Sequence, residues 1–571
     1  MSNVYGSDVV VQALQQLGIR HVAINPGATF RGLHESLVSA GAPQVIETLD
    51  EKVAAAIAHG YAKSTNTPMA VAVHDIVGLQ SGSMGIFNAW VDQAPMLVLG
   101  GSGPADHTRR RPWIDWIHSA RMQSLVVREY TKWDDEPVSI NAFPESLFRA
   151  YDIACMAPQG PTYVALDALL QESVADPVPR MPSVSIRRNT LAIPDGDLEP
   201  VIDLLLAASR PVILADLVGR SRSGYEALTA LAELVSAPVV DLGARHNFPN
   251  HHPNDLSLSR AEVLGEADVV LALDIRDVTW SLSTTDVEKH SYVPLVRPDV
   301  TVAVIGLQEL MHRGFLDLEG YVHAEHSLTG DTAVVLPRLV ELIRERQPDS
   351  PERARWLAGQ RDAQTARQPV LPDYSGSGLA ASHVIAETWK AVHDGPWQLA
   401  HLGTNPSPNY YWMRRLWRLS EYNAYLGRSG GGGIGYGLGA SMGAALGQVD
   451  DRIVVNLQPD GDGLATASAL WTAAHHRLPV LMVTLNNRMY AQERMHQSTL
   501  ARLRGRDTGS STVGVDINDP AVDLAGLARA QGVEAWGPVD SSEALAKALA
   551  LATRVVREER RPALVDAVLT S

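Results

Sequence analysis

The chain has 571 residues, too many for a single hydrophobic core, and this length favours three or four domains. Its formal net charge of −16 argues against a nucleic-acid partner, because phosphate binding needs a surplus of lysine and arginine. Cys155 is the single cysteine, which excludes an intramolecular disulfide and a metal site made of several thiolates.

The N-terminus does not have a basic segment followed by an apolar core, so the sequence predicts no signal peptide. The longest weakly polar run, at 430–447, is rich in glycine, and glycine at that density makes a poor membrane helix. We therefore expect a cytoplasmic protein without a membrane partner.

Short β-rich runs alternate with helical patterns in the first third of the chain. The runs at 21–27, 69–75 and 94–101 predict strands, and the amphipathic segment 51–64 predicts a helix. Alternation of this kind is typical of a parallel sheet with helices on both faces. The sequence therefore predicts a first α/β unit at residues 1–175.

Two further α/β units are expected after a proline-broken linker at 173–190. A second alternating pattern predicts a central Rossmann-like unit at 190–346, and a polar stretch with several prolines follows at about 347–378. The alternation restarts in a third unit at 375–571. The predicted fold class is thus α/β, with three doubly wound parallel-sheet domains.

Polar side chains follow two apolar runs of the third unit. Asp460 and Asp462 come after the first run, and Asn486 and Asn487 close the second. The runs predict parallel strands whose carboxyl ends share one crevice. An acid, an amide oxygen and a backbone carbonyl there would leave room on Mg²⁺ for two phosphate oxygens and a water. The alternative interpretation is that the acids are turn residues or helix caps.

This segment resembles the metal and diphosphate motif of thiamine-diphosphate enzymes of the acetolactate synthase, pyruvate oxidase and 2-oxo-acid decarboxylase family. In the benzoylformate decarboxylase branch, the metal-binding acid lies eight residues before the first Ser of a helix. That helix is similar to the run that starts here at Ser468. The resemblance implies Asp460 and Asn487 as side-chain ligands of Mg²⁺, together with the carbonyl of Met489. It also places Gly461 and Asp462 at the diphosphate, where Asp462 is a candidate helix cap.

A glycine-rich segment at 430–439 precedes these acids, and a flexible linker is its plainest interpretation. It resembles the G-G-L-G segment of the same family, which implies that the carbonyl of Gly432 binds the aminopyrimidine and that Ile434 bends the cofactor. The segment 401–407 follows a predicted strand and holds three candidate diphosphate-binding residues, Thr404, Asn405 and Ser407.

Glu51 lies at the start of a predicted helix, where an acid commonly serves the helix dipole. Its spacing to Gly60 and Tyr61 resembles the E…GYA signature of the family, whose Glu hydrogen-bonds the pyrimidine ring and promotes the tautomer that removes the thiazolium proton. The resemblance implies that Glu51 is catalytic. It also implies a homodimer at least, and usually a homotetramer, because the first unit of one subunit faces the third unit of another.

Residues that would contact the substrate are fewer. His74 falls on the first active-site His of benzoylformate decarboxylase, which implies a proton-relay role. Ala28 stands where that enzyme has a substrate-contacting Ser, and His290 lies near the place of its second His but outside the motif. Glu493, in a predicted lid helix with His496, is a candidate second acid or base.

Two other polar clusters have simpler interpretations. The basic loop at Arg109–Arg111 is a candidate anchor for a carboxylate or phosphate, or it is solvated. The adjacent pairs His251 and His252, and His475 and His476, are not predicted to bind a metal, because adjacent helical residues point apart.

The resemblance implies a lyase that decarboxylates a 2-oxo acid without oxidation, through an enamine, with thiamine diphosphate and Mg²⁺ as cofactors. The alternatives are an acetolactate-synthase-like carboligase, a 2-hydroxyacyl-CoA lyase, and a non-catalytic protein of the same fold. FAD in the central unit is a further candidate cofactor, by analogy with acetolactate synthase. The expected partners are the small-molecule substrate and further copies of the chain.

Overall fold

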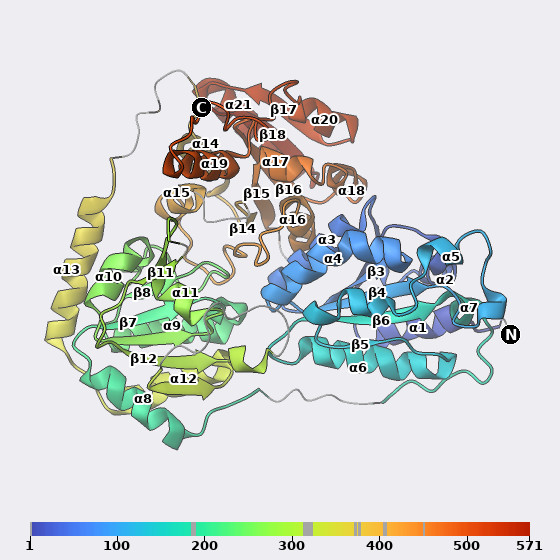
Figure 1. Cartoon of the computed structure of the whole chain (residues 1–571), viewed down its shortest axis with the longest axis horizontal. Coiled ribbons are helices and arrows are strands. Elements are labelled where there is room, and N and C mark those ends of the chain that lie inside the picture. The colour runs from blue at the N-terminus through green and yellow to red at the C-terminus, as the bar shows by residue number, and fades with distance from the viewer. Residues whose placement is uncertain are drawn as a thin grey trace.

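The computed structural model describes residues 3–183, 190–289, 291–311, 324–370, 374, 378–403, 408–448 and 451–570. The chain forms three parallel-sheet α/β units, which confirms the predicted fold class. Figure 1 shows the first unit in blue and cyan, the central unit in green and yellow, and the third in orange and red. Within the described residues, no helix combines the length and the apolar character needed to cross a membrane.

The first unit is a parallel sheet of order β2-β1-β3-β4-β6-β5 with helices on both faces. Because both faces are covered, β3 and β4 are almost entirely apolar and buried. The strands are β1 (His21–Ile24), β2 (Gln44–Glu47), β3 (Met69–Val73), β4 (Met96–Ser102), β5 (Asp134–Asp135) and β6 (Pro161–Asp167). The core on one face includes α1 (Gly6–Gln16), α2 (Arg31–Ala40) and α6 (Phe143–Cys155), and that on the other includes α3 (Glu51–Thr65) and α4 (Asp75–Val91).

The central unit is a parallel sheet of order β13-β12-β9-β7-β8, and β10 and β11 form a separate two-stranded antiparallel sheet. Its strands are β7 (Pro211–Ala215), β8 (Val239–Asp241), β9 (Val269–Leu273), β10 (Ser283–Asp286), β11 (Ser291–Pro294), β12 (Thr301–Gly306) and β13 (His326–Thr329). Its helices include α8 (Asp195–Ala207), α9 (Arg222–Leu234), α10 (Arg260–Glu266), α11 (Val278–Ser281) and α12 (Thr332–Glu345).

One helix stands where the sequence predicts only a polar stretch, at 347–378. Here α13 runs over Pro351–Arg367, with Ser350 as its N-cap and proline in its first turn. Arg353 is its buried residue and donates to the Leu205 carbonyl (3.0 Å). The helix has no apolar stripe, so hydrophobic periodicity could not reveal it.

The third unit is a parallel sheet of order β14-β15-β16-β18-β17, and the predicted pairing of β15 with β16 is confirmed. Its strands are β14 (Trp397–His401), β15 (Ile453–Pro459), β16 (Val480–Asn486), β17 (Glu534–Val539) and β18 (Ala563–Val568). Its helices include α14 (Ala381–Val392), α15 (Pro408–Leu416), α16 (Gly437–Leu446), α17 (Asp460–Leu464), α18 (Ala469–His475), α19 (Ala491–Leu503), α20 (Leu524–Ala530) and α21 (Ser542–Glu558).

The first and third units pack together through α3 and α16. A Cβ atom added at Gly60 would collide with the backbone of Ala440, and one added at Gly443 with the carbonyl of Ile57. The two helix backbones are therefore in direct contact, an approach that only small residues permit. This packing brings the start of α3 beside the glycine-rich segment that precedes α16.

Candidate functional site

Asp460 follows the last residue of β15 and begins α17, as the strand-end prediction requires. Its carboxylate is buried and accepts hydrogen bonds from the backbone amides of Gly461 (2.9 Å) and Arg488 (2.6 Å). Burial raises the pKa of Asp460, and no ion pair in the described part of the chain includes it. A divalent cation would supply the missing positive charge, so the acid fits the predicted metal ligand.

The amide pair at the end of β16 lies beside this acid. The Arg488 N–H that Asp460 binds also donates to Oδ1 of Asn486 (3.2 Å). Oδ1 of Asn487 accepts from the Met489 amide (3.1 Å). The structure therefore brings Asp460 and the turn with Asn487 and Met489 to one edge of the sheet.

Asp462 has a different role from Asp460. Its carboxylate binds Nε2 of His401 (3.0 Å), the side-chain amide of Gln458 (2.6 Å) and the backbone N–H of Gly435 (2.6 Å). Burial alone would raise the pKa of Asp462, but these hydrogen bonds outweigh burial and lower it. Asp462 is thus not the cap of α17; it ties the glycine-rich segment to the end of β15.

The glycine-rich segment is packed along α4. Added Cβ atoms at Gly431 and Gly433 would collide with Asn88 and Met84, both on α4. Gly432 has a left-handed backbone (φ +63°), which favours glycine. This close packing argues against a flexible linker.

Ile434, the residue predicted to bend the cofactor, keeps 42% of its surface exposed. The carbonyl of Gly432 and the side chain of Ile434 therefore belong to a loop whose position α4 fixes. An apolar side chain of this size on a fixed loop fits the predicted contact with a cofactor.

Glu51 is the first residue of α3 and is buried, with 7% of its surface exposed. Two glycines of α4 make room for it: a Cβ atom at Gly78 would lie 2.6 Å from Oε1 of Glu51, and one at Gly82 would be 3.5 Å from its carbonyl oxygen. Asp50 caps the helix by accepting from the Lys52 amide (2.7 Å). Helix α4 therefore fixes both Glu51 and the glycine-rich segment.

The two halves of the predicted site meet within this single chain, whereas the family resemblance implies that the first unit of one subunit faces the third unit of another. Nζ of Lys52, next to Glu51, is 3.0 Å from the position that a Cβ atom of Gly435 would take. Gly435 in turn is bonded to Asp462, two residues after Asp460. A continuous set of contacts thus joins the start of α3 to the carboxyl end of β15.

His74 is the N-cap residue of α4 and lies one turn before Gly78. Its Nδ1 is 2.8 Å from Oγ1 of Thr29, and its Nε2 is 3.2 Å from Nδ1 of His118. Burial, with the neighbouring His118 and Arg111, lowers the pKa of His74 to about 4. The ring is therefore neutral at physiological pH and both accepts and donates hydrogen bonds.

His118 is a site residue that sequence reasoning missed. It ends the short helix α5 (Asp115–His118), in the loop interpreted only as basic. The sequence shows a histidine at this place in the loop but not its neighbour in space. In the structure the loop folds onto α4, and the rings of His118 and His74 lie with centroids 5.2 Å apart.

The basic loop does not present three free cations. Arg111 pairs with Asp115 (2.7 Å) and donates to the Ala28 carbonyl (2.9 Å), whereas Arg109 is exposed. The charge of Arg111 is thus already paired, which weakens its case as a substrate anchor.

Asp75, next to His74, is fully buried, and burial raises its pKa to about 7.

Glu493, the candidate second acid or base, lies on the surface of the third unit. Glu493 is on α19 with 66% of its side chain exposed, and its carboxylate is 3.8 Å from His496. Helix α19 contains no buried residue. The candidates Thr404, Asn405 and Ser407, and also His290, lie outside the described residues.

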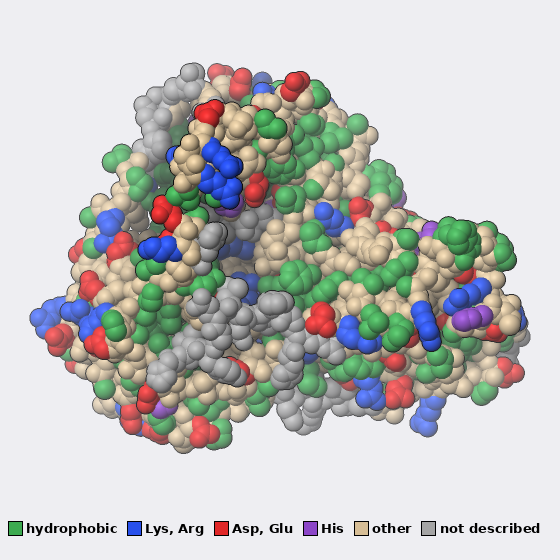
Figure 2. Space-filling view, viewed as in Figure 1, with side chains coloured by type: hydrophobic (Ala, Val, Ile, Leu, Met, Phe, Trp, Pro, Cys, Tyr) green, Lys and Arg blue, Asp and Glu red, His purple; other side chains and the backbone are tan. Residues whose placement is uncertain are grey.

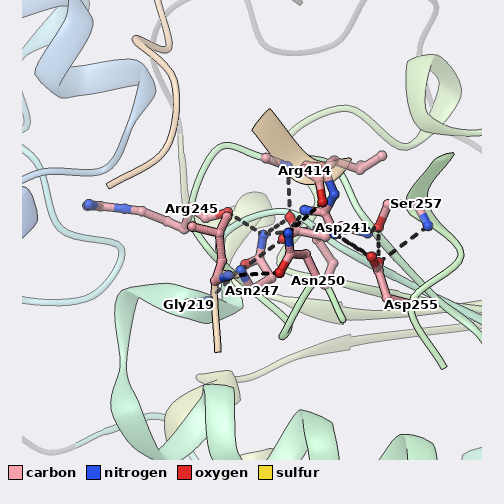
Figure 3. A network of polar contacts seen from close by, with 12 residues as sticks. Gly219, Asp241, Arg245, Asn247, Asn250, Asp255, Ser257 and Arg414 are labelled. Atoms are coloured by element: carbon pink, nitrogen blue, oxygen red, sulfur yellow. Dashed lines mark hydrogen bonds and ion pairs between the residues drawn. The ribbon is translucent and has the colours of Figure 1, made fainter. Parts of the chain in front are cut away.

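The carboxyl end of the central sheet is where an open α/β sheet binds nucleotides. Arg414, from α15 of the third unit, places its guanidinium there between Asp241 (3.1 Å) and Asp255 (2.8 Å) (Figure 3). Asn247 donates to Asp241 (2.7 Å), and the network is buried. Side chains thus fill the ends of β7 and β8 where a flavin was a candidate.

Comparison with protein-family models gives two matches. The thiamine pyrophosphate enzyme N-terminal TPP binding domain matches residues 4–124, and the C-terminal TPP binding domain of the same enzymes matches residues 408–567. The N-terminal match contains Glu51 and His74, and the C-terminal match contains Gly432, Asp460 and Asn487. Both halves of the site described above therefore fall within these domains.

Curated relatives cover most of the chain. Acetolactate synthase isozyme 3 large subunit of Escherichia coli (strain K12) is 23% identical over 519 residues, covering 88% of this chain and 85% of that protein. Benzoylformate decarboxylase of Pseudomonas aeruginosa is 24% identical over 496 residues, covering 85% of each.

Solved structures show the same fold along the whole chain. A putative thiamin diphosphate-dependent enzyme from Mycobacterium smegmatis superimposes with a TM-score of 0.77 at 22% identity, covering 100% of both chains. Benzoylformate decarboxylase from Polynucleobacter necessarius gives 0.80 at 18% identity, covering 100% of this chain and 99% of that one. The chain therefore has the N- and C-terminal domains of thiamine-diphosphate enzymes and belongs to the family that includes acetolactate synthases and benzoylformate decarboxylase.

Proposed function

We propose that the chain is a thiamine-diphosphate- and Mg²⁺-dependent lyase that decarboxylates a 2-oxo acid without oxidation. The observation that carries this proposal is the set of contacts by which Gly435 connects the start of α3, where Glu51 is buried, to the turn after β15, where Asp460 is buried. Thiamine diphosphate, when bound, supplies the electron sink for the breaking carbon–carbon bond.

The third unit holds and orients the cofactor in this proposal. Asp460, Asn487 and the carbonyl of Met489 would hold the cation for the diphosphate. The carbonyl of Gly432 would accept a hydrogen bond from the aminopyrimidine, and the exposed side chain of Ile434 would contact the cofactor. A Cβ atom at Gly461 would be 2.5 Å from the ring of Tyr490, so the turn after β15 tolerates little increase in size.

The first unit moves protons. Glu51 would hydrogen-bond the pyrimidine ring and hold the proton exchanged there, in a buried position that limits competition from water. His74 lies one helical turn before Gly78, the glycine of α4 that contacts Glu51, and its ring nitrogens are within hydrogen-bond distance of Thr29 and His118. This line of groups supports delivery of a proton to the carbon that loses CO₂, which is the outcome of a decarboxylase.

Carboligation is a second candidate, supported by relatives named acetolactate synthase in Escherichia coli and Arabidopsis thaliana. In that reaction a second carbonyl compound, rather than a proton, takes the new bond. We further propose that no flavin is required, because Arg414 and its partners fill the carboxyl ends of β7 and β8 in the central sheet.

We also propose that the working unit is a homodimer or a larger homo-oligomer. Large apolar side chains near His118 are exposed, among them Trp113 (68%), Trp116 (75%) and Met122 (51%). Figure 2 shows hydrophobic side chains gathered over α5. Exposed apolar groups of this size are typical of contact surfaces. Light scattering of the purified protein measures its mass in solution and so the number of chains in the assembly.

Assays of CO₂ release test the reaction. The protein, with thiamine diphosphate and Mg²⁺, is incubated with pyruvate or phenylglyoxylate, with and without an aldehyde acceptor. A decarboxylase releases CO₂ and the free aldehyde without an acceptor, whereas a carboligase yields a 2-hydroxy ketone or acid. No CO₂ from a panel of aliphatic and aromatic 2-oxo acids would rule out both candidates.

A further inference from the structure

Three side chains with metal-ligating atoms converge where the first and third units meet. Nε2 of His475, at the end of α18, is 2.6 Å from Oε2 of Glu47, at the end of β2. Nε2 of His476 is 3.9 Å from the same oxygen. One ligand atom from each of the three residues lies within 4.8 Å of the other two.

This convergence corrects the expectation that adjacent histidines point apart. That expectation holds inside a helix, but α18 ends at His475 and His476 is its C-cap residue. The next residue, Arg477, has a left-handed backbone (φ +50°), so the chain turns sharply there. Both imidazoles consequently face Glu47.

The surroundings fix the three groups. The ring of His475 stacks on Trp471, with centroids 4.7 Å apart and planes 9° from parallel. Oγ1 of Thr472 donates to the Glu47 carbonyl (3.1 Å), and the Glu47 amide donates to Nε2 of His476 (3.0 Å). The ring stack and the Thr472 bond hold His475 and Glu47 in place, whereas the Glu47 amide occupies the Nε2 atom of His476 that an ion would bind.

The exposure of the site also suits coordination. The side chains of Glu47 (40%) and His475 (45%) are partly exposed, which lets a hydrated ion enter and leaves positions for water.

We propose that Glu47, His475 and His476 form a binding site for a divalent transition-metal ion of the Zn²⁺ class. Two imidazole nitrogens and one carboxylate oxygen suit Zn²⁺, and they leave one tetrahedral position for water. The site is distinct from the predicted Mg²⁺ site, where the donors are all oxygens. To bind Nε2 of His476, the ion must displace the hydrogen bond that the Glu47 amide donates to this atom. We therefore expect a Kd in the micromolar range rather than a lower one.

Occupation of this site would join the two units close to the catalytic region. Glu47 is four residues before Glu51. Strand β2, which contains Glu47, belongs to the first unit, and α18 belongs to the third. A ligand that binds only the folded protein stabilises it according to its concentration relative to Kd. We therefore expect Zn²⁺ to raise the thermal unfolding midpoint of the protein.

Calorimetry with Zn²⁺ tests the site on the full chain saturated with thiamine diphosphate and Mg²⁺, so that the other cofactors are constant. We expect one Zn²⁺ per chain, and an affinity at least about tenfold weaker in His475→Gln and Glu47→Gln. His475 is half-exposed and these replacements keep similar size, so circular dichroism should match that of wild type.

The second adjacent histidine pair provides a matched control. His252 lies 3.1 Å from Glu233, but His251 is directed to the Trp417 carbonyl (3.0 Å), so this pair does not form a three-residue site. His252→Gln should leave the Zn²⁺ affinity and the Zn²⁺-dependent rise of the unfolding midpoint unchanged. Equal Zn²⁺ affinity in wild type and His475→Gln, or no heat in wild type, would show that Glu47 and His475 form an ion pair only and would overturn the proposal.

Discussion

Oε1 of Glu51 lies against the backbone of Gly78, so closely that a Cβ atom at position 78 would be 2.6 Å from it. The glycine on α4 thus makes the space in which the carboxyl of α3 is held. Gly78→Ala should favour the helix locally but push the carboxyl away from its position. We expect turnover to fall by about 10- to 100-fold while the far-ultraviolet circular dichroism is unchanged. Turnover equal to wild type would mean that the carboxyl does not act from this position.

Glu51→Gln keeps the size of the side chain and removes its ability to exchange a proton. We expect turnover to fall by on the order of 10²–10⁴-fold, with the fold intact and with cofactor still bound. The exchange of the C2 hydrogen of bound thiamine diphosphate with deuterium, followed by NMR after acid quench, should slow in parallel. Turnover within about twofold of wild type would remove Glu51 from the mechanism.

Asp460 and Asp462 should respond differently to replacement by alanine. Asp460→Ala removes the predicted cation ligand, so Mg²⁺-dependent cofactor binding should be lost with little change in the unfolding midpoint. Asp462→Ala leaves the Gly435 amide and His401 without their acceptor, so it should lower the midpoint. If Asp462→Ala abolished Mg²⁺-dependent cofactor binding while Asp460→Ala did not, the assignment of the two acids would be reversed.

Asp75 should make the stability of the protein depend on pH. Burial raises its pKa from 3.8 to about 7, so the folded chain binds more protons than the unfolded chain between these values. Stability therefore falls as pH rises from about 4 to about 7. Asp75→Asn removes this charge and tolerates the left-handed backbone (φ +50°). Its thermal midpoint should exceed that of wild type by about 2 °C at pH 8 and converge with it at pH 5. A midpoint difference that does not depend on pH would contradict this account of Asp75.

Some features of the site could be predicted because they depend on local sequence. Asp460 and Asn487 follow neighbouring parallel strands, and the order of strand, helix and strand fixes where such residues meet. Glu51 was predicted by its spacing to Gly60 and Tyr61, which keeps all three on one helix. Residues placed by a single secondary-structure element or by adjacent strands are thus within reach of sequence reasoning.

Other features depend on packing that no local pattern records. His118 reaches His74 only because the loop that contains it folds over the start of α4. The convergence of His475 and His476 depends on the residue at which α18 ends, and helix ends are the least predictable part of a helix. Neither position carries a periodicity or a motif that would have shown its neighbour in advance.

Replacement by alanine should have opposite effects on stability at a glycine in the α3–α16 contact and at a glycine on the open surface of α13. Gly443→Ala places a methyl group against the Ile57 carbonyl, and overpacking of this kind costs about 1–3 kcal/mol. Gly359→Ala, within α13, meets no atom within 4 Å and should stabilise by roughly 0.5–1 kcal/mol. Chemical denaturation measures both, and equal effects would show that the two helix backbones are not in close contact in solution.

The most direct test of the site is isothermal titration of the purified chain with thiamine diphosphate. The titration is carried out with Mg²⁺ present and again after its removal with EDTA. We predict saturable heat with one cofactor per chain in Mg²⁺ and a loss of affinity of at least about 100-fold without it. The absence of any binding heat in Mg²⁺ buffer, or binding that EDTA leaves unchanged, would contradict the account.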